Sequence, residues 1–123
     1  MQALAIAAGG ALGALMRYWL STATYAWLGR GFPWGTLAVN VLGSFVMGVL
    51  YILLLDRLTS GPEVRAFLLI GFLGAFTTFS TFSIETLNLL EEAQIGKALL
   101  NAGGSVVVCI AAAWLGVILG RQL

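Results

Sequence analysis

Charged residues are so unevenly spaced along this chain that they mark out membrane-spanning segments. The stretches 31–55, 66–84 and 98–120 contain no charged residue and consist mainly of apolar side chains. A bilayer core about 30 Å thick is crossed by roughly 20 residues of α-helix. Each stretch is long enough for one crossing, which predicts an integral membrane protein built from helices.

The first segment, residues 3–28, is apolar on both sides of a single charge, Arg17. We interpret it as a fourth span. A secretory signal peptide is the alternative, but such a peptide begins with basic residues, and none precedes this apolar run. We therefore expect an all-α protein with one membrane domain over residues 1–123 and four transmembrane helices at about 3–28, 34–55, 65–91 and 97–120.

The composition of the 123-residue chain excludes most other classes of protein. Apolar residues make up 60% of it and charged residues only 9%, too few for the surface of a soluble domain. One cysteine and no histidine argue against disulfide scaffolds, common zinc or haem sites and most hydrolase sites, so we do not expect an enzyme. A net charge of +1 provides no basic surface for nucleic acid.

Some of the 16 glycines lie four residues away from another small residue within an expected helix. Pairs of small residues at this spacing let helix backbones approach closely. The pairs are Gly9 with Gly13, Ser44 with Gly48, and Gly116 with Gly120. The simpler interpretation is packing within one chain, and the alternative is that some of these faces join two chains in a dimer.

Positive charges favour one orientation of this bundle only weakly. Four spans place both termini on one side with Arg57, Arg65 and Arg121, and leave Arg30 and Lys97 on the other. Orientation follows the excess of Lys and Arg in short loops, which is here three against two. Either another feature sets the orientation, or the chain inserts both ways and opposed copies form an antiparallel, dual-topology homodimer. We favour the homodimer.

The third expected helix carries five hydroxyl groups within seven residues. They belong to Thr77, Thr78, Ser80, Thr81 and Ser83. Hydroxyls and unwound backbone are tolerated in a membrane only inside protein or beside a watery cavity. The cluster predicts a helix break near mid-membrane, whose freed carbonyl oxygens suit a hard cation such as Na⁺. The alternative is that each hydroxyl bonds the carbonyl four residues earlier and the helix merely bends.

Phe76, Phe79 and Phe82 recur every third residue through the same stretch. An aromatic ring is negative on its face and positive at its edge, so two ring edges turned toward a pore can meet a small anion. Asn40 adds two N–H donors from the second span. A stripe of rings is more often part of a core, so both interpretations of the phenylalanines stay open at this point.

Arg17 and Glu85 are the two ionisable residues farthest from a helix end. Charges inside a membrane are costly and often mark a pathway or its entrance. The alternative for both residues is a structural salt bridge, or a side chain that extends to the membrane surface.

Three segments together resemble the small fluoride channels of the Fluc, or CrcB, family. The segments are Gly9–Tyr18, Gly35–Asn40 and Gly71–Glu85, the last of which reads GFLGAFTTFSTFSIE. They fall in three of the four expected helices, in the expected order. The fourth helix, around Asn101–Ser105, matches only in being apolar and glycine-rich, so no pore residue is assigned there.

The resemblance implies a passive, fluoride-selective channel that exports cytoplasmic fluoride across the cell membrane. It implies an antiparallel homodimer with two pores and a central structural Na⁺, whose partners are fluoride, membrane lipid and a second copy of the chain. The implied pore residues are Phe79, Phe82, Asn40, Ser80 and Thr81. Arg17 and Glu85 would line the entrances, and main-chain carbonyls of Gly74 and Thr77 would bind Na⁺.

Two other functions are compatible with a small four-helix membrane protein. A small multidrug-resistance-type, proton-coupled exporter also has four short helices, but it needs a titratable carboxylate within its first helix. Here that helix contains Arg17 and no acidic residue. A non-transporting assembly subunit is the third possibility, but a scaffold has no need of five clustered hydroxyls.

Overall fold

The computed structural model describes residues 1–57 and 61–123. Regular structure in the described residues is helical, and four segments are long and apolar enough to cross a membrane. They are Gln2–Leu28, Trp34–Leu55, Pro62–Glu91 and Ile95–Gln122. Each expected helix overlaps one of them, with ends that differ by no more than one helical turn.

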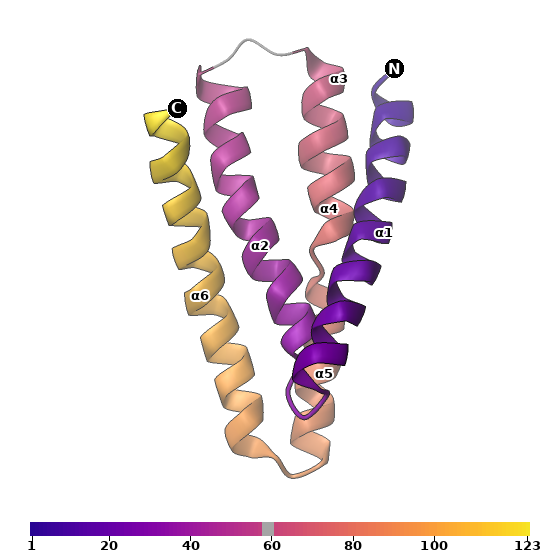
Figure 1. Cartoon of the computed structure of the whole chain (residues 1–123), viewed down its shortest axis with the longest axis vertical. Coiled ribbons are helices and arrows are strands. Elements are labelled where there is room, and N and C mark those ends of the chain that lie inside the picture. The colour runs from indigo at the N-terminus through magenta and orange to yellow at the C-terminus, as the bar shows by residue number, and fades with distance from the viewer. Residues whose placement is uncertain (58–60) are drawn as a thin grey trace.

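The second and third segments are each built from more than one element. Figure 1 shows the interruption of the third segment between α4 and α5. The elements in chain order are α1 (Gln2–Leu28), α2 (Trp34–Tyr51), the π-helical η1 (Ile52–Arg57), α3 (Pro62–Arg65), the π-helical η2 (Ala66–Phe72), α4 (Leu73–Phe76), α5 (Phe79–Glu91) and α6 (Ile95–Gln122).

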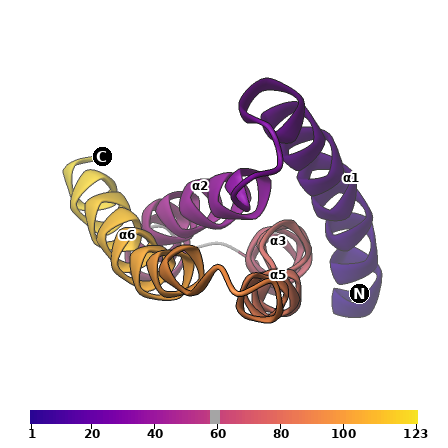
Figure 2. The same ribbon diagram turned by 90° about the horizontal axis from the view of Figure 1, so that it is seen from below.

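Viewed from below, α1 and α6 lie at opposite edges of the bundle, with α2 and the third segment between them (Figure 2). The most extensive contact is between α2 and α6, and α1 packs on η2, α4 and α2. Both termini lie at the same end of the bundle, as an even number of crossings requires (Figure 1).

The contact between α2 and α6 depends on two buried glycines. A Cβ atom on Gly48 would overlap the carbonyl oxygen of Ala113, and one on Gly116 would overlap that of Phe45. The two backbones therefore meet with no side chain between them. For these two glycines, the interpretation as packing within one chain is confirmed.

The backbones of α1 and η2 also meet closely at glycine residues. Cβ atoms on Gly9 and Gly13 would overlap the carbonyl oxygens of Phe67 and Phe72, respectively. Both glycines are buried on the inner face of α1. The first and third segments are thereby held as closely as the second and fourth.

The buried core lies between these two helix pairs. Val39, Leu73 and Phe76 are 0%, 1% and 5% exposed and pack together. On the outer faces, large apolar side chains such as Trp27 and Trp114 are exposed, as expected where lipid covers the protein. The core thus joins α2 to α4 at the point where α4 ends.

Gly116 allows the close approach of α2 and α6 because it has no side chain. Replacing Gly116 by Ala puts a methyl group against the Phe45 carbonyl, so α2 and α6 must separate. We expect the free energy of unfolding to fall by about 1–3 kcal/mol, the usual cost of overpacking. Titration of the purified protein with a denaturing detergent, followed by circular dichroism, measures this loss.

Gly96→Ala is the matched control in the same helix. Among the described residues outside its own stretch of helix, nothing lies within 4 Å of a Cβ atom at Gly96. We expect this variant to unfold like the parent. Equal stability of the Gly116→Ala and Gly96→Ala variants would contradict the close approach of α2 and α6.

Candidate functional site

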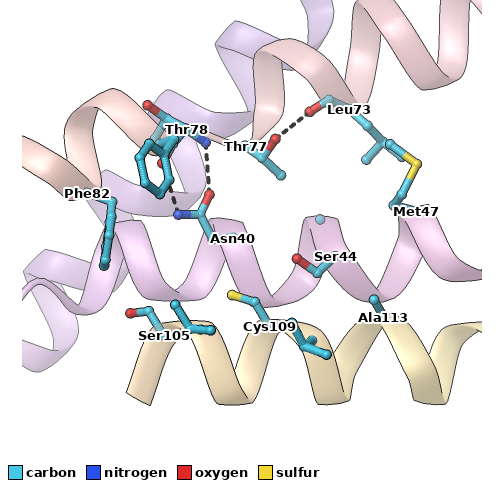
Figure 3. A pocket seen from close by; sticks show the side chains of 14 residues that line it. Asn40, Ser44, Met47, Leu73, Thr77, Thr78, Phe82, Ser105, Cys109 and Ala113 are labelled. Atoms are coloured by element: carbon cyan, nitrogen blue, oxygen red, sulfur yellow. Dashed lines mark hydrogen bonds between the residues drawn. The ribbon is translucent and has the colours of Figure 1, made fainter. Parts of the chain in front are cut away.

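A groove of about 460 Å³ lies between α2, α6 and the junction of α4 with α5 (Figure 3). Every residue that lines it is uncharged. Its polar side chains are Asn40 and Ser44 on α2, Thr77 and Thr78 at the junction, and Ser105 and Cys109 on α6. The groove therefore offers hydrogen-bonding groups without a fixed charge.

The side-chain amide of Asn40 forms two hydrogen bonds with the main chain of Thr78 (Figure 3). The Thr78 N–H donates to Asn40 Oδ1 over 2.8 Å, and Asn40 Nδ2 donates to the Thr78 carbonyl oxygen over 3.0 Å. The amide thus satisfies the Thr78 N–H, which has no acceptor within a helix, and adds a hydrogen bond to the Thr78 carbonyl oxygen. The second N–H of Asn40 has no partner among the described residues, so it remains a possible donor to a ligand in the groove.

The backbone is extended at Thr77 and Thr78, between α4 and α5, with φ and ψ of −91° and 158° at Thr77 and −151° and 121° at Thr78. The N–H and Oγ1 of Thr77 both donate to the carbonyl oxygen of Leu73, over 3.1 and 2.9 Å. Thr78 Oγ1 accepts a hydrogen bond from the N–H of Thr81 over 3.2 Å. Thr77 therefore closes α4, and Thr78 is the N-terminal cap of α5.

The extended residues leave main-chain carbonyl groups available. Among the described residues, the carbonyl oxygens of Gly74 and Thr77 accept no hydrogen bond. Gly74 is exposed, and Thr77 lines the groove. Carbonyl oxygens are ligands for hard cations, and the described residues contain no cluster of histidine, cysteine and acidic side chains that offers another metal site.

The three rings of the phenylalanine stripe divide between the core and the groove. Phe76 is buried and stacks on Phe72, with ring centroids 5.9 Å apart. Phe79 and Phe82 both line the groove, with centroids 5.3 Å apart and ring planes tilted by 40°. Phe79 is 76% exposed. Phe76 is therefore a core residue, whereas Phe79 and Phe82 lie at the groove.

Ser80 and Thr81 lie beside the cap of α5. Thr78 Oγ1 is 3.3 Å from Ser80 Oγ and 3.1 Å from Thr81 Oγ1. Neither residue is among those that line the groove of a single chain. Of the other hydroxyls, Thr77 and Ser83 bond the carbonyls four residues earlier, as the simpler interpretation predicted. The cluster thus combines helix capping with back-bonding.

The polar face of α6 was missed by the sequence interpretation. Ser105 and Cys109 are one turn apart and both line the groove. Asn101, one turn earlier, is buried and bonded to Ser105. Polar residues at this four-residue spacing share one helix face, and that spacing was the signal in the sequence that could have identified them.

Glu85 lies away from the groove, in a second cavity of about 190 Å³ beside the loop between α1 and α2. The Tyr25 hydroxyl donates to Glu85 Oε2 over 2.7 Å and is 3.5 Å from Thr36 Oγ1. The Arg30 guanidinium lies over the Tyr25 ring, 4.5 Å from its centroid. Within the described part of the chain, Glu85 forms no salt bridge.

Arg17 is partly buried on α1 and lines neither cavity. Its side chain forms no hydrogen bond or salt bridge with the described residues. The structure therefore brings Asn40, Phe79 and Phe82 together at one groove, and places Arg17 and Glu85 elsewhere.

The hydrogen bonds with Asn40 should protect the main-chain amide of Thr78 from hydrogen exchange. Asn40→Leu removes both bonds to Thr78, and an unpaired buried polar group costs about 1–3 kcal/mol. We expect the Thr78 amide hydrogen to exchange roughly ten times faster or more, measured by hydrogen exchange in lipid nanodiscs. In Asn40→Asp, an acceptor for that N–H is kept, so the amide stays better protected than in Asn40→Leu.

Asn88→Leu is the control, because Asn88 is exposed on α5 and lies in the second cavity. Exchange at Thr78 should not change in this variant. If Asn40→Leu also left that exchange unchanged, the amide pair would not be what secures the junction of α4 with α5.

The chain matches the family model described as CrcB-like protein, Camphor Resistance (CrcB), over residues 4–117. It is 56% identical over 123 residues to the fluoride-specific ion channel FluC of Magnetococcus marinus, with both chains covered completely. Identity to the FluC of Hydrogenovibrio crunogenus is 52% over 122 residues, covering 99% and 92% of the two chains. Identity to the FluC of Methylococcus capsulatus is 57% over 119 residues, 97% of this chain and 52% of that relative. The chain therefore belongs to the CrcB-like protein family.

Proposed function

We propose that this multi-pass membrane protein is a passive, fluoride-specific ion channel of the cell membrane. The Magnetococcus marinus relative, which carries the name fluoride-specific ion channel, is matched over its full length, and such relatives are ion channels rather than enzymes. The observation that carries the proposal is the groove, whose wall combines two phenylalanine rings, an amide and hydroxyls without any charged side chain.

Such a wall suits a small anion that must pass through quickly. Hydroxyl and amide donors replace part of its water shell, and the positive ring edges of Phe79 and Phe82 add weak attraction. A fixed positive charge would bind the anion more tightly and slow its release. We assign the donor role to Asn40 and, on the resemblance, to Ser80 and Thr81.

We further propose that the working unit is an antiparallel homodimer with two pores. The groove of one chain is bounded by α2, α6 and the α4–α5 junction, and Phe79 at its edge is 76% exposed. A second copy packed on this face would close the groove and cover the ring. The nearly even distribution of Lys and Arg between the two sides supports opposite insertion of the two copies.

A central structural Na⁺ is also part of the proposal. The extended residues Thr77 and Thr78 lie near the middle of the segment Pro62–Glu91, which supports a helix break near mid-membrane. The free carbonyl oxygens of Gly74 and Thr77 fit a hard monovalent cation, which would supply the positive charge that their dipoles need. Carbonyls from two copies would complete the ligand set.

Fluoride that enters as neutral HF ionises in a neutral cytoplasm, so a passive channel lets the membrane potential drive the anion outward. Arg17 and Glu85 would act at the entrances of the pores. A proton-coupled exporter is not favoured, because α1 contains no acidic residue to carry the proton.

Substitution of Phe79 and Phe82 tests whether these rings take part in conduction or only in packing. Phe79→Ile and Phe82→Ile keep an apolar side chain but remove the positive edge. One edge contact is worth about 0.5–1.5 kcal/mol, so we expect either change to reduce fluoride flux by about two- to tenfold. Fluoride efflux from liposomes that contain the purified protein measures this, with chloride as the reference anion.

Phe72→Ile is the matched control, because Phe72 stacks on Phe76 outside the groove. It should lower stability but leave the flux per folded channel unchanged. If both groove variants conduct fluoride like the parent, the rings are packing residues and the edge mechanism is wrong. A parent protein that carries no fluoride would overturn the proposed function itself.

The substitution Gly74→Ala tests the proposed dimer and the proposed Na⁺ site together. Among the described residues outside the adjacent helix backbone, the nearest atom to a Cβ on Gly74 is the Leu69 carbonyl oxygen at 4.0 Å, so an alanine fits within one chain. A loss of assembly in Gly74→Ala must then arise from the second copy or from Na⁺. We expect its dimerisation in Na⁺ to be weaker by about tenfold, a cost typical of overpacking.

Single-molecule photobleaching at decreasing protein density, in Na⁺ and in N-methylglucamine, measures this equilibrium. Thr77→Ser is the control, because the proposed ligand is the main-chain carbonyl and serine keeps it. Dimerisation that is the same for parent and Gly74→Ala, with and without Na⁺, would rule out the cation site.

A further inference from the structure

A chain of hydrogen bonds joins α6 to the main chain of Phe82. Asn101 Nδ2 donates to Thr86 Oγ1 over 2.8 Å, and that hydroxyl donates to the Phe82 carbonyl oxygen over 2.8 Å. On the other side of the amide, Ser105 Oγ donates to Asn101 Oδ1 over 3.2 Å. The network runs from a groove residue of α6 to the residue that carries a groove ring.

Asn101 is the member that carries this network from one helix to the other. It is 2% exposed and does not line the groove, while its neighbours Ser105 and Phe82 do. A hydrogen bond between buried groups is more consequential than one at the surface, because losing it leaves an unpaired polar group. Because α5 contacts α6 at fewer places than α2 does, the bond between Asn101 and Thr86 is one of few restraints between α5 and α6.

The direction of the Phe82 ring matters for an edge contact. A ring attracts an anion at its edge and repels it from its face, so the attraction depends on how the ring is oriented toward the groove. The Thr86 hydroxyl lies one turn after Phe82 and bonds both to its backbone and to Asn101. A bond to α6 at this point therefore restrains α5 one turn after the residue that carries the ring.

We propose that Asn101 is a positioning residue for anion selectivity, acting through Thr86 on the orientation of the Phe82 ring. This inference rests on the proposed function, because selectivity has meaning only in a channel. Asn101 does not itself contact the anion, because its Oδ1 and an N–H are already bonded and it lies outside the groove lining.

The experiment compares Asn101→Leu, Thr86→Val and the double variant with the parent. In liposomes, the ratio of fluoride to chloride flux is independent of how much protein has folded, because both anions use the same channels. We expect each single change to lower this ratio by about threefold or more, and the double variant to lower it no further. Thr86→Ser keeps the hydroxyl and should retain the parent ratio.

Thr24→Val is the matched control. Thr24 Oγ1 donates to the Leu20 carbonyl over 2.8 Å in α1, the same bond within a helix but without a link to the groove. Its removal should leave the ratio unchanged. A second readout is the ¹⁹F resonance of 4-fluorophenylalanine placed at position 82, which should shift or broaden in Asn101→Leu and Thr86→Val and return in Thr86→Ser.

An unchanged ratio and an unchanged ¹⁹F resonance in Thr86→Val would overturn the inference. So would a lower ratio in Asn101→Leu alone, because that result would mean the amide acts on the anion directly. A parent that carries no fluoride overturns the proposed function and with it the selectivity role. The ¹⁹F resonance would distinguish that failure from a failure of Asn101 to orient the ring.

Discussion

The paired hydrogen bonds between Asn40 and the main chain of Thr78 are the interaction on which the groove depends. A polypeptide inside a membrane has no water to satisfy its main-chain groups, so extended residues are stable only where protein supplies partners. One amide provides both a donor and an acceptor to the extended backbone between α4 and α5. Beyond that point Phe79 and Phe82 face the groove, while Phe76 before it stays in the core.

Close helix contacts keep the partners of this interaction in place. Gly48 and Gly116 bring the backbones of α2 and α6 together, and α2 carries Asn40 while α6 carries the polar face of the groove. Contact without intervening side chains leaves little freedom to slide, since any shift places backbone atoms on top of one another. The same glycines that stabilise the fold therefore determine the width of the groove.

The sequence was informative about the site where residues of one kind cluster, and silent where partners are far apart. The hydroxyl run includes Thr77 and Thr78, where the backbone is extended. The amide of Asn40 was expected to offer two donors to an anion, but one N–H and the oxygen bond Thr78. Glu85 was weighed as a salt-bridge partner, and it is instead hydrogen-bonded to Tyr25. In each case the partner belongs to another helix.

The distribution of charges by itself determined that the chain crosses a membrane with four helices, because an uncharged stretch of that length has few other stable environments. Local motifs likewise determined the family. Only the tertiary structure decided which hydroxyls cap a helix, which rings leave the core, and that the polar face of α6 lines the groove. A sequence records each donor and acceptor, but hydrogen bonding and burial depend on what other helices bring within about 3 Å, and that is a property of packing.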